Sequence, residues 1–147
     1  MVIIQKKNFK IQDEISAIKK NNNKIGSVVT FVGYVRDFDY ECINSSKTLK
    51  IFHYDGMTEK VISEIIGITK KKWDIDQVNV IHRVGNLKIN DPIVLVIVSS
   101  SHRQDAFSAC NYVIDHLKTK APFWKKEVSN INSKWVEQKE SDLVKVK

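Results

Sequence analysis

Alternating and continuous runs of apolar residues predict several strands in this chain. Residues 26–35 are dominated by β-branched and aromatic side chains, which is typical of a strand. The apolar run over 93–99 is short and continuous and follows the turn at Asn90-Asp91-Pro92, so it indicates a strand buried on both faces. The predicted strands are 26–35, 48–54, 78–84 and 93–99, with extended structure from Phe123 and a last short strand over 134–137.

Two helices are predicted in the first half of the chain. A short helix near 13–20 ends at the polar turn Asn21-Asn22-Asn23. The second helix is predicted from apolar residues that recur at helical spacing, namely Val61, Ile65, Ile68 and Trp73.

A third helix is predicted to follow Ser101. Ser101 and Gln104 fit a capping box, in which the serine hydroxyl caps the helix start. Pro122 requires the helix to end shortly before it, near 118–120. The apolar stripe that this helix is expected to bury comprises Ala106, Phe107, Ala109, Cys110, Val113, Ile114 and Leu117.

The order of these elements indicates the fold class. From Thr48 onward it is β-α-β-β-α-β, the split βαβ arrangement of ferredoxin-like folds. We therefore expect an α+β fold with a two-layer core of ferredoxin-like or hammerhead type and additional antiparallel strands at 26–35 and near Trp135. No repeat or Gly/Pro-rich linker divides residues 1–147, which are expected to form a single domain. The polar segment 37–47 is expected to be an exposed, mobile loop.

The charge balance points to anionic partners. The 147 residues include 24 Lys and Arg against 17 Asp and Glu, which gives a net charge of +7. Such an excess favours phosphates, nucleic acid or an acidic protein as partners, although a general bias toward lysine can also supply part of it.

Hydropathy and cysteine usage indicate the compartment. The longest apolar run, 93–98, is far too short to span a bilayer, and residues 1–10 lack the features of a signal peptide. We therefore expect a cytoplasmic protein without membrane contact. Cys42 and Cys110 lack metal-ligand spacing and are expected to stay reduced, Cys110 as a core residue and Cys42 in a polar stretch without an activating neighbour. No metal site and no cofactor are expected.

Residues 102–127 carry the most informative polar pattern. His102 and Arg103 occupy the first turn of the third predicted helix, where free backbone N–H groups and the helix dipole already favour an anion. Beyond the other end of this helix, the rigid apolar segment Ala121-Pro122-Phe123-Trp124 lies between Lys118 and Lys125. This combination indicates an anion-binding catalytic pocket. The alternative is a solvated arginine and a capping histidine on an ordinary helix.

The length of the helix separates the two groups of cations. Lys118 follows His102 by sixteen residues, which corresponds to about 24 Å along a helix. A small substrate cannot contact both ends. Either only one end is functional or two copies of the chain share the site, and we favour the second interpretation, which requires a symmetric dimer.

The chain resembles the large, catalytic subunit of molybdopterin synthase over nearly its whole length. Each matching segment is weakly diagnostic alone, but together, in this order and spacing, they are highly specific. The segments are Gly26-Ser-Val-Val-Thr-Phe-Val-Gly-Tyr-Val-Arg36, His53-Tyr-Asp-Gly-Met-Thr-Glu-Lys60, Ile81-His-Arg-Val-Gly85, Ser101-His-Arg103 and Leu117-Lys-Thr-Lys-Ala-Pro-Phe-Trp-Lys-Lys-Glu127.

The resemblance implies a reaction and its partners. Enzymes of this family convert cyclic pyranopterin monophosphate into molybdopterin by installing two sulfurs as a dithiolene. The sulfur arrives as a thiocarboxylate on the C-terminal Gly-Gly of a small ubiquitin-like subunit, and a dimer of large subunits forms the centre of the assembly. This chain ends in Lys145-Val-Lys147 and has no activated cysteine, so it is not expected to carry the sulfur itself.

The resemblance also implies roles for individual residues. Lys118 is the first candidate for acid/base chemistry beside the thiocarboxylate carbon, and Lys125 is the second, because a partly desolvated lysine near other cations loses its proton more readily. The implied substrate-binding residues, which hold the phosphate and pterin or line the pocket, are Val35, Arg36, His102, Arg103, Lys126 and Glu127.

Two positions depart from the family pattern. Tyr34 stands where a lysine is frequent, which removes a potential cationic contact. Lys120 stands where arginine is frequent, which keeps the charge and loses the bidentate geometry.

The remaining histidines and tryptophans are interpreted as structural. His82 and Arg83 lie in a predicted strand, where alternation directs them to opposite faces. His53 and His116 are expected to be structural or solvated, and Trp73 and Trp135 to lie in the core or at an interface.

The basic α+β character of the chain also allows two other functions. A basic RNA-binding module would require aromatic residues in a characteristic pattern on a sheet face, and no predicted strand has that pattern. A non-catalytic scaffold that only docks the sulfur carrier is opposed by the presence of Lys118, Lys125, Arg36, His102 and Arg103.

Overall fold

Three helices and two four-stranded sheets make up the described part of the chain, residues 1–38 and 46–137 of a computed structural model. The predicted α+β class is confirmed. In chain order the elements are β1 (Val2–Gln5), α1 (Ile11–Lys19), β2 (Ser27–Tyr34), β3 (Thr48–His53), α2 (Met57–Lys72), β4 (Gln77–Arg83), β5 (Gly85–Leu87), β6 (Pro92–Ser100), α3 (Arg103–Lys120), β7 (Phe123–Val128) and β8 (Ser133–Trp135).

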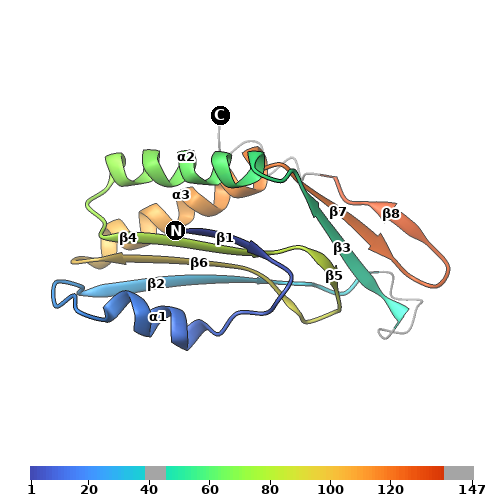
Figure 1. Cartoon of the computed structure of the whole chain (residues 1–147), viewed down its shortest axis with the longest axis horizontal. Coiled ribbons are helices and arrows are strands. Elements are labelled where there is room, and N and C mark those ends of the chain that lie inside the picture. Colours follow the sequence, from blue (N-terminus) through green and yellow to red (C-terminus); the bar gives the residue numbers. More distant parts are fainter. Residues whose placement is uncertain (39–45, 138–147) are drawn as a thin grey trace.

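The first sheet has the strand order β1-β4-β6-β2, in which β1 runs parallel to β4 and the other neighbours are antiparallel. Helices α2 and α3 cover one face of this sheet, and α1 covers the other (Figure 1). The central strands β4 and β6 are therefore buried on both faces, which explains the continuous apolar run over 93–99. Buried residues of these strands are Val78, Val80, Val96 and Val98 toward α2 and α3, and Ile81, Leu95 and Ile97 toward α1.

The second sheet, with the order β5-β3-β7-β8, is antiparallel throughout and extends from one end of the first (Figure 1). The predicted β-α-β-β-α-β order is present as β3, α2, β4, β6, α3 and β7. The outer two strands of this series lie in the second sheet, and the middle two lie in the first. A separate apolar cluster packs where the sheets meet: Val35, Leu49, Ile51, Val84, Leu87 and Ile93.

The predicted capping box at Ser101 is wrong. Helix α3 begins at Arg103, and its N-cap is His102, which makes no side-chain capping hydrogen bond. The Ser101 hydroxyl instead donates to the carbonyl oxygen of Lys24, at 3.1 Å. The His102 N–H donates to Ser100 Oγ, at 3.2 Å. The Ser101 hydroxyl, which the local sequence pattern assigned to the helix start, is therefore used in a tertiary hydrogen bond instead.

The prediction of an exposed loop over 37–47 is wrong at its C-terminal end. The Lys47 side chain is 1% exposed and its Nζ lies 2.6 Å from Asp37 Oδ1. A lysine is buried in this way when a carboxylate compensates its charge. Residues 39–45 of this segment, including Cys42, lie outside the described residues.

Two strands had no clear sequence signal. β1 and β5 have four and three residues, too few for a periodic pattern. β1 exists because Val2 and its neighbours pair with β4, with Val2 opposite Val80. The final strand covers Ser133–Trp135, slightly earlier than the predicted 134–137.

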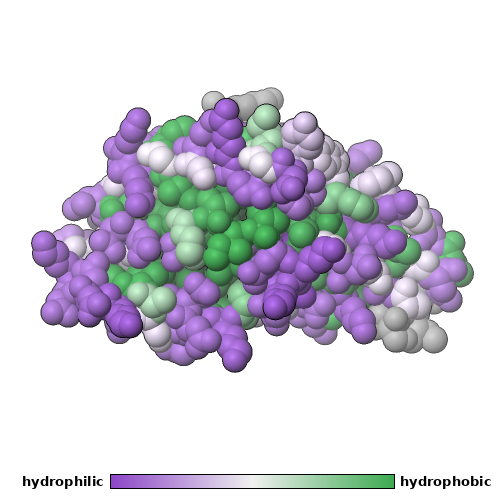
Figure 2. Space-filling view, viewed as in Figure 1, coloured by the Kyte–Doolittle hydropathy of each residue, from purple (hydrophilic) through white to green (hydrophobic). Residues whose placement is uncertain are grey.

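The surface of the molecule is mixed in polarity. Figure 2 shows apolar side chains gathered between α2 and α1, where β1 is the edge of the first sheet. None of the helices in the described residues is long and apolar enough to cross a membrane.

Candidate functional site

A pocket of about 560 Å³ lies between the C-terminal end of α3, strands of the first sheet and β7. Three cationic residues line it, Arg36, Lys118 and Lys125. Phe31 and Phe123 supply part of its apolar wall. A concave, partly apolar space of this size with a few converging charges is typical of a site for a small organic anion.

The turn from α3 to β7 brings the two lysines to the same space. Lys118 lies in the last turn of α3, which ends at Lys120 because Pro122 disfavours a continued helix. β7 then begins at Phe123. Alternation along a strand puts Phe123 and Lys125 on one face, and both line the pocket. The rigid segment between the lysines therefore acts as the corner that joins them.

The end of β2 supplies the third cation. The pairing of β2 with β6 is regular up to Gly33 and shifts register between Gly33 and Tyr34. Tyr34 is exposed and lines the pocket together with Arg36. The departure from the family pattern at Tyr34 therefore affects a residue of the pocket wall.

His82 also lines this pocket, although the sequence indicated only a structural role. The residue is 6% exposed, and its ring stacks on Phe123 with centroids 3.8 Å apart and planes 15° apart. Its Nδ1 lies 2.8 Å from the carbonyl oxygen of Arg83. The pKa of His82 is lowered to about 3, mainly by burial and also by nearby Lys125 and His53, whereas that hydrogen bond acts to raise it. The imidazole is therefore neutral at neutral pH.

The neighbouring Arg83 points elsewhere, as alternation predicted. Its Nε donates to the carbonyl oxygen of Lys6 at 3.2 Å, and its guanidinium also donates to Pro92, at 3.0 Å. Arg83 thus ties backbone segments together and does not line the pocket. The one feature of the sequence that could have drawn attention to His82 is its place as a titratable residue within an otherwise apolar predicted strand.

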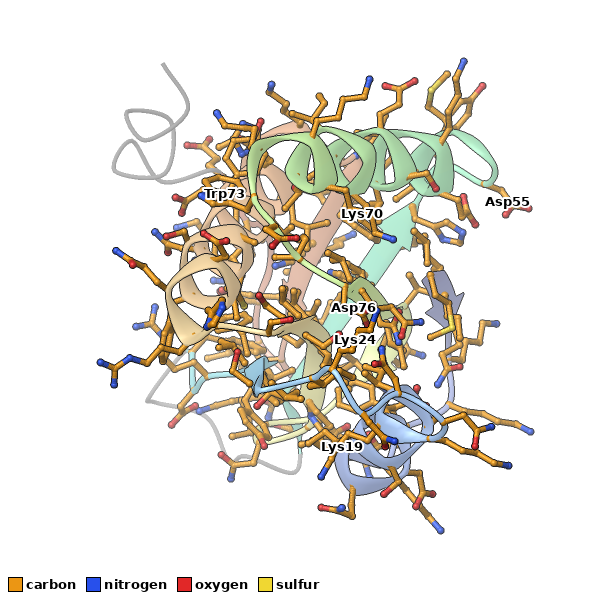
Figure 3. All side chains as sticks on the ribbon, turned by 90° about the vertical axis from the view of Figure 1, so that its left-hand side faces the viewer. Lys19, Lys24, Asp55, Lys70, Trp73 and Asp76 are labelled. Atoms are coloured by element: carbon orange, nitrogen blue, oxygen red, sulfur yellow. The ribbon has the colours of Figure 1, made fainter. Side chains whose placement is uncertain are left out.

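His102 and Arg103 lie at the opposite end of α3 from Lys118 and do not line the pocket. Both are exposed, and within residues 1–38 and 46–137 neither forms a salt bridge. Figure 3 views the molecule from this end, with Lys24 and Asp76 labelled on neighbouring turns. Asp76 Oδ2 is occupied there by hydrogen bonds from Asn22, at 3.0 Å, and Ser99, at 3.2 Å. Because they lie at opposite ends of α3, one copy of the chain does not bring His102 and Arg103 together with the lysines of the pocket.

Three further predicted site residues do not face the pocket. Val35 is 2% exposed and packs in the apolar cluster between the sheets. Lys126 lies on the opposite face of β7 from Lys125, with its Nζ 5.3 Å from the Trp135 ring centroid. Glu127 lines a second, smaller depression, together with Lys134 and Trp135.

Other candidate residues play structural parts. Cys110 is buried in the core, as expected, and burial raises the pKa of its thiol to about 11, so it is no nucleophile at neutral pH. Trp73 packs against the main core beside Tyr112, whereas Trp135 is exposed and contacts Phe52. His116 is buried, with Nδ1 2.8 Å from the carbonyl oxygen of Tyr112.

One group of side chains has donor atoms close enough to hold a metal ion. His53 Nε2 lies 3.5 Å from Asp55 Oδ1 and 3.9 Å from Glu59 Oε1. The three potential ligand atoms lie within 4.8 Å of one another. Asp55 is fully exposed at the turn before α2, where acidic residues also stabilise a helix start without any ion.

Comparison with known proteins identifies a family. The family model described as MoaE protein matches residues 4–120. The molybdopterin synthase catalytic subunit of Vibrio cholerae is 44% identical over 96% of this chain and 92% of its own length. The corresponding subunit of Haemophilus influenzae is 50% identical over 82% of this chain and 79% of its own length.

Solved structures agree with these relatives. Molybdopterin cofactor biosynthesis protein E from Burkholderia multivorans is 39% identical and superposes with a TM-score of 0.81, covering 99% of this chain and 95% of that one. Molybdopterin synthase from Staphylococcus aureus is 32% identical with a TM-score of 0.82, covering 92% of this chain and 96% of that one. Sequence and fold thus agree, and the chain belongs to the MoaE family, the catalytic subunits of molybdopterin synthase.

Proposed function

We propose that the pocket between α3 and β7 is where sulfur passes from the thiocarboxylate of a small ubiquitin-like carrier to cyclic pyranopterin monophosphate, which becomes molybdopterin. The observation that carries this proposal is the convergence of Lys118, Lys125 and Arg36 on one pocket in a chain of this family. Both reactants are anionic, so fixed cations favour their simultaneous presence.

The residues of the pocket suit the chemistry of this transfer. Each sulfur leaves an acyl carbon of the carrier, which takes up an oxygen from water and becomes a carboxylate. Lys118 moves protons beside that carbon, and Lys125 and Arg36 stabilise the negative charge that develops on the reacting groups. The thiol of Cys110 is buried and protonated, so this residue does not compete as a sulfur donor.

The position of α3 supports a site shared by two copies of the chain. His102 and Arg103 lie at the far end of the helix, about 24 Å from Lys118, and are exposed. In our proposal they reach the pocket of a second copy, where they bind the phosphate and the pterin. Val35 fixes the backbone between Tyr34 and Arg36, and Lys126 and Glu127 line the adjoining surface along β7.

The small carrier subunit is the second partner in this proposal, with its Gly-Gly tail entering the pocket. We also propose that the reaction takes place in the cytoplasm. The unpaired, buried thiol of Cys110 is compatible with a reducing compartment.

Turnover with a matched pair of lysine variants tests the proposal. Purified protein is mixed with thiocarboxylated carrier and cyclic pyranopterin monophosphate, and the oxidised fluorescent derivative of molybdopterin is measured. Lys118→Ala should lower the rate by a factor of about 100 or more, the usual contribution of an acid/base group. Lys120→Ala removes an exposed lysine from the same helical turn and should leave turnover close to the parental level.

The midpoint of urea unfolding should be similar in both variants, because both side chains are exposed. Parental turnover by a folded Lys118→Ala variant would refute the role of this lysine. A stable complex with the carrier and no product from the parental protein would instead support the scaffold function.

A further inference from the structure

His82 is held in one orientation at the wall of the pocket. Phe123 stacks on its ring, with centroids 3.8 Å apart, and the carbonyl oxygen of Arg83 lies 2.8 Å from Nδ1. A carbonyl oxygen only accepts hydrogen bonds, so Nδ1 carries the proton. In the neutral ring Nε2 then has a lone pair and acts as an acceptor.

The surroundings keep this acceptor from becoming a donor. Burial, together with the positive charge of Lys125, lowers the pKa of His82 to about 3. Within residues 1–38 and 46–137 no hydrogen bond to Nε2 is formed, and the 6% of His82 that is exposed lies at the pocket it lines. In the described residues the fully enclosed side-chain atoms without a partner are Glu59 Oε2 and Asn79 Oδ1, and Nε2 is not one of them. Nε2 is therefore open to the pocket that His82 lines, and a ligand there can donate to it.

We infer that Nε2 of His82 accepts a hydrogen bond from a ring N–H of the pterin and thereby sets the orientation of the substrate in the pocket. This inference rests on the proposed function of the pocket. It adds a neutral, specificity-determining contact to the cationic residues already described.

The chemistry of the ligands favours the pterin over other groups. Phosphate and thiocarboxylate offer only acceptor atoms and negative charge, which suit Lys118, Lys125 and Arg36. Pterin rings offer N–H donors and a flat face, which suit the neutral imidazole and the apolar wall that includes Phe31 and Phe123. The other possible donor is a peptide N–H in the tail of the carrier, and the experiment below separates the two.

A base function for His82 fits the same observations less well. A general base works best when its pKa lies near the operating pH. Burial and the nearby charge of Lys125 instead move the pKa of His82 away from neutral pH, to about 3. Its contribution is therefore to binding and orientation, and proton transfer stays with Lys118.

Binding measurements on three variants test the inference. His82→Phe keeps a flat ring against Phe123 and removes the acceptor, whereas His82→Gln offers an amide oxygen near the position of Nε2. His116→Phe is the matched control, because His116 is also buried, is also bonded through Nδ1 to a carbonyl oxygen, and stacks beside Tyr112 outside the pocket. Calorimetry measures the affinity for cyclic pyranopterin monophosphate without carrier, and for the carrier without substrate.

His82→Phe should weaken substrate binding by about tenfold or more, because an N–H of the ligand loses its partner in a buried site. His82→Gln should recover most of that loss, and His116→Phe should bind like the parental protein. Carrier affinity should be unchanged in all three variants. In turnover, the loss in His82→Phe should appear mainly in KM, because the acceptor acts on the bound substrate as well as on the transition state.

Two results would overturn the inference. One is parental substrate affinity in a folded His82→Phe protein, and the other is weakened binding of the carrier with unchanged binding of the substrate. A measurement on the parental protein covers the case in which the variants fail to fold. The ¹⁵N resonance of His82 Nε2 should shift on addition of substrate, and a shift on addition of carrier alone would again contradict the inference. Parental turnover that depends on Lys118 but not on His82 would refute this inference and leave the proposed function intact.

Discussion

Three cations and one neutral imidazole divide the chemistry of the pocket between them. Arg36, Lys118 and Lys125 line a partly solvated space, where cationic side chains attract anionic groups. His82 is buried behind them and stays neutral. The charge on Lys125 thus serves the site twice, because it attracts the reactants and also disfavours a proton on the imidazole.

The suppressed protonation of His82 predicts a pH dependence of stability. The unfolded chain binds a proton at this side chain below its ordinary pKa of 6.5, whereas the folded protein excludes that proton until the pH approaches about 3. Acidification from pH 6.5 toward 3 therefore favours the unfolded state, by up to about 1.4 kcal/mol for each pH unit. Urea unfolding at a series of pH values should show a shallower loss of stability in His82→Phe than in the parental protein. Parallel curves for the two proteins would refute this effect.

At the scale of elements, the two ends of α3 have different surroundings. Its C-terminal end turns sharply at Pro122 into β7 and builds the pocket. Just before its N-terminal end, the last residue of β6 is bonded to the segment that precedes β2, because the Gly26 N–H donates to the carbonyl oxygen of Ser100 at 3.0 Å. The close backbone approach at Gly26 therefore determines where His102 and Arg103 are presented.

Two glycine substitutions test how tightly this junction is packed. A Cβ at Gly26 would collide with the backbone carbonyl oxygen of Ser101, so Gly26→Ala should lower the free energy of unfolding by about 1–3 kcal/mol. Gly67 lies within α2 with open space around it, so Gly67→Ala should raise the free energy of unfolding by about 0.5–1 kcal/mol. Urea unfolding of the parental protein and both variants measures these changes. A Gly26→Ala variant as stable as the parental protein would show that the junction can widen without cost.

At the scale of the whole molecule, one copy separates groups that the proposed reaction needs together. The pocket holds Lys118, Lys125 and Arg36, while His102 and Arg103 are exposed at the other end of α3. A symmetric dimer in which each copy completes the pocket of the other resolves this separation and forms two equivalent sites.

Mixing two inactive variants tests the shared site. In random mixtures of Lys118→Ala and Arg103→Ala copies, about half of the dimers are mixed, and one of their two sites is intact. Turnover should therefore recover to about a quarter of the parental rate, although each variant alone is nearly inactive. Activity equal to the mean of the two separate variants, with exchange of copies verified, would show that each copy has its own complete site.

The strands and helices follow from local sequence, and so do the lysines of the pocket. Strand composition and periodicity predicted β2, β3, β4, β6, α2 and α3, because alternation and helical spacing record which side chains face a core. Pro122 and the alternation of β7 bring Lys118 and Lys125 to one space through contacts a few residues apart, which is why this part of the site could be predicted from the sequence.

The remaining features depend on contacts that the local sequence does not contain. The division of strands between two sheets and the existence of β1 depend on pairing between distant segments, such as Val2 with Val80. The Ser101 hydroxyl bonds to a carbonyl 77 positions away, and the burial of Lys47 depends on Asp37. His82 became part of the pocket only through its stacking on Phe123 from another sheet. The sequence by itself therefore determined the helices, the longer strands and the family chemistry. The tertiary structure decided the short strands β1 and β5 and which side chains meet, because strand pairing, burial and long-range hydrogen bonds exist only once the sheets and helices pack.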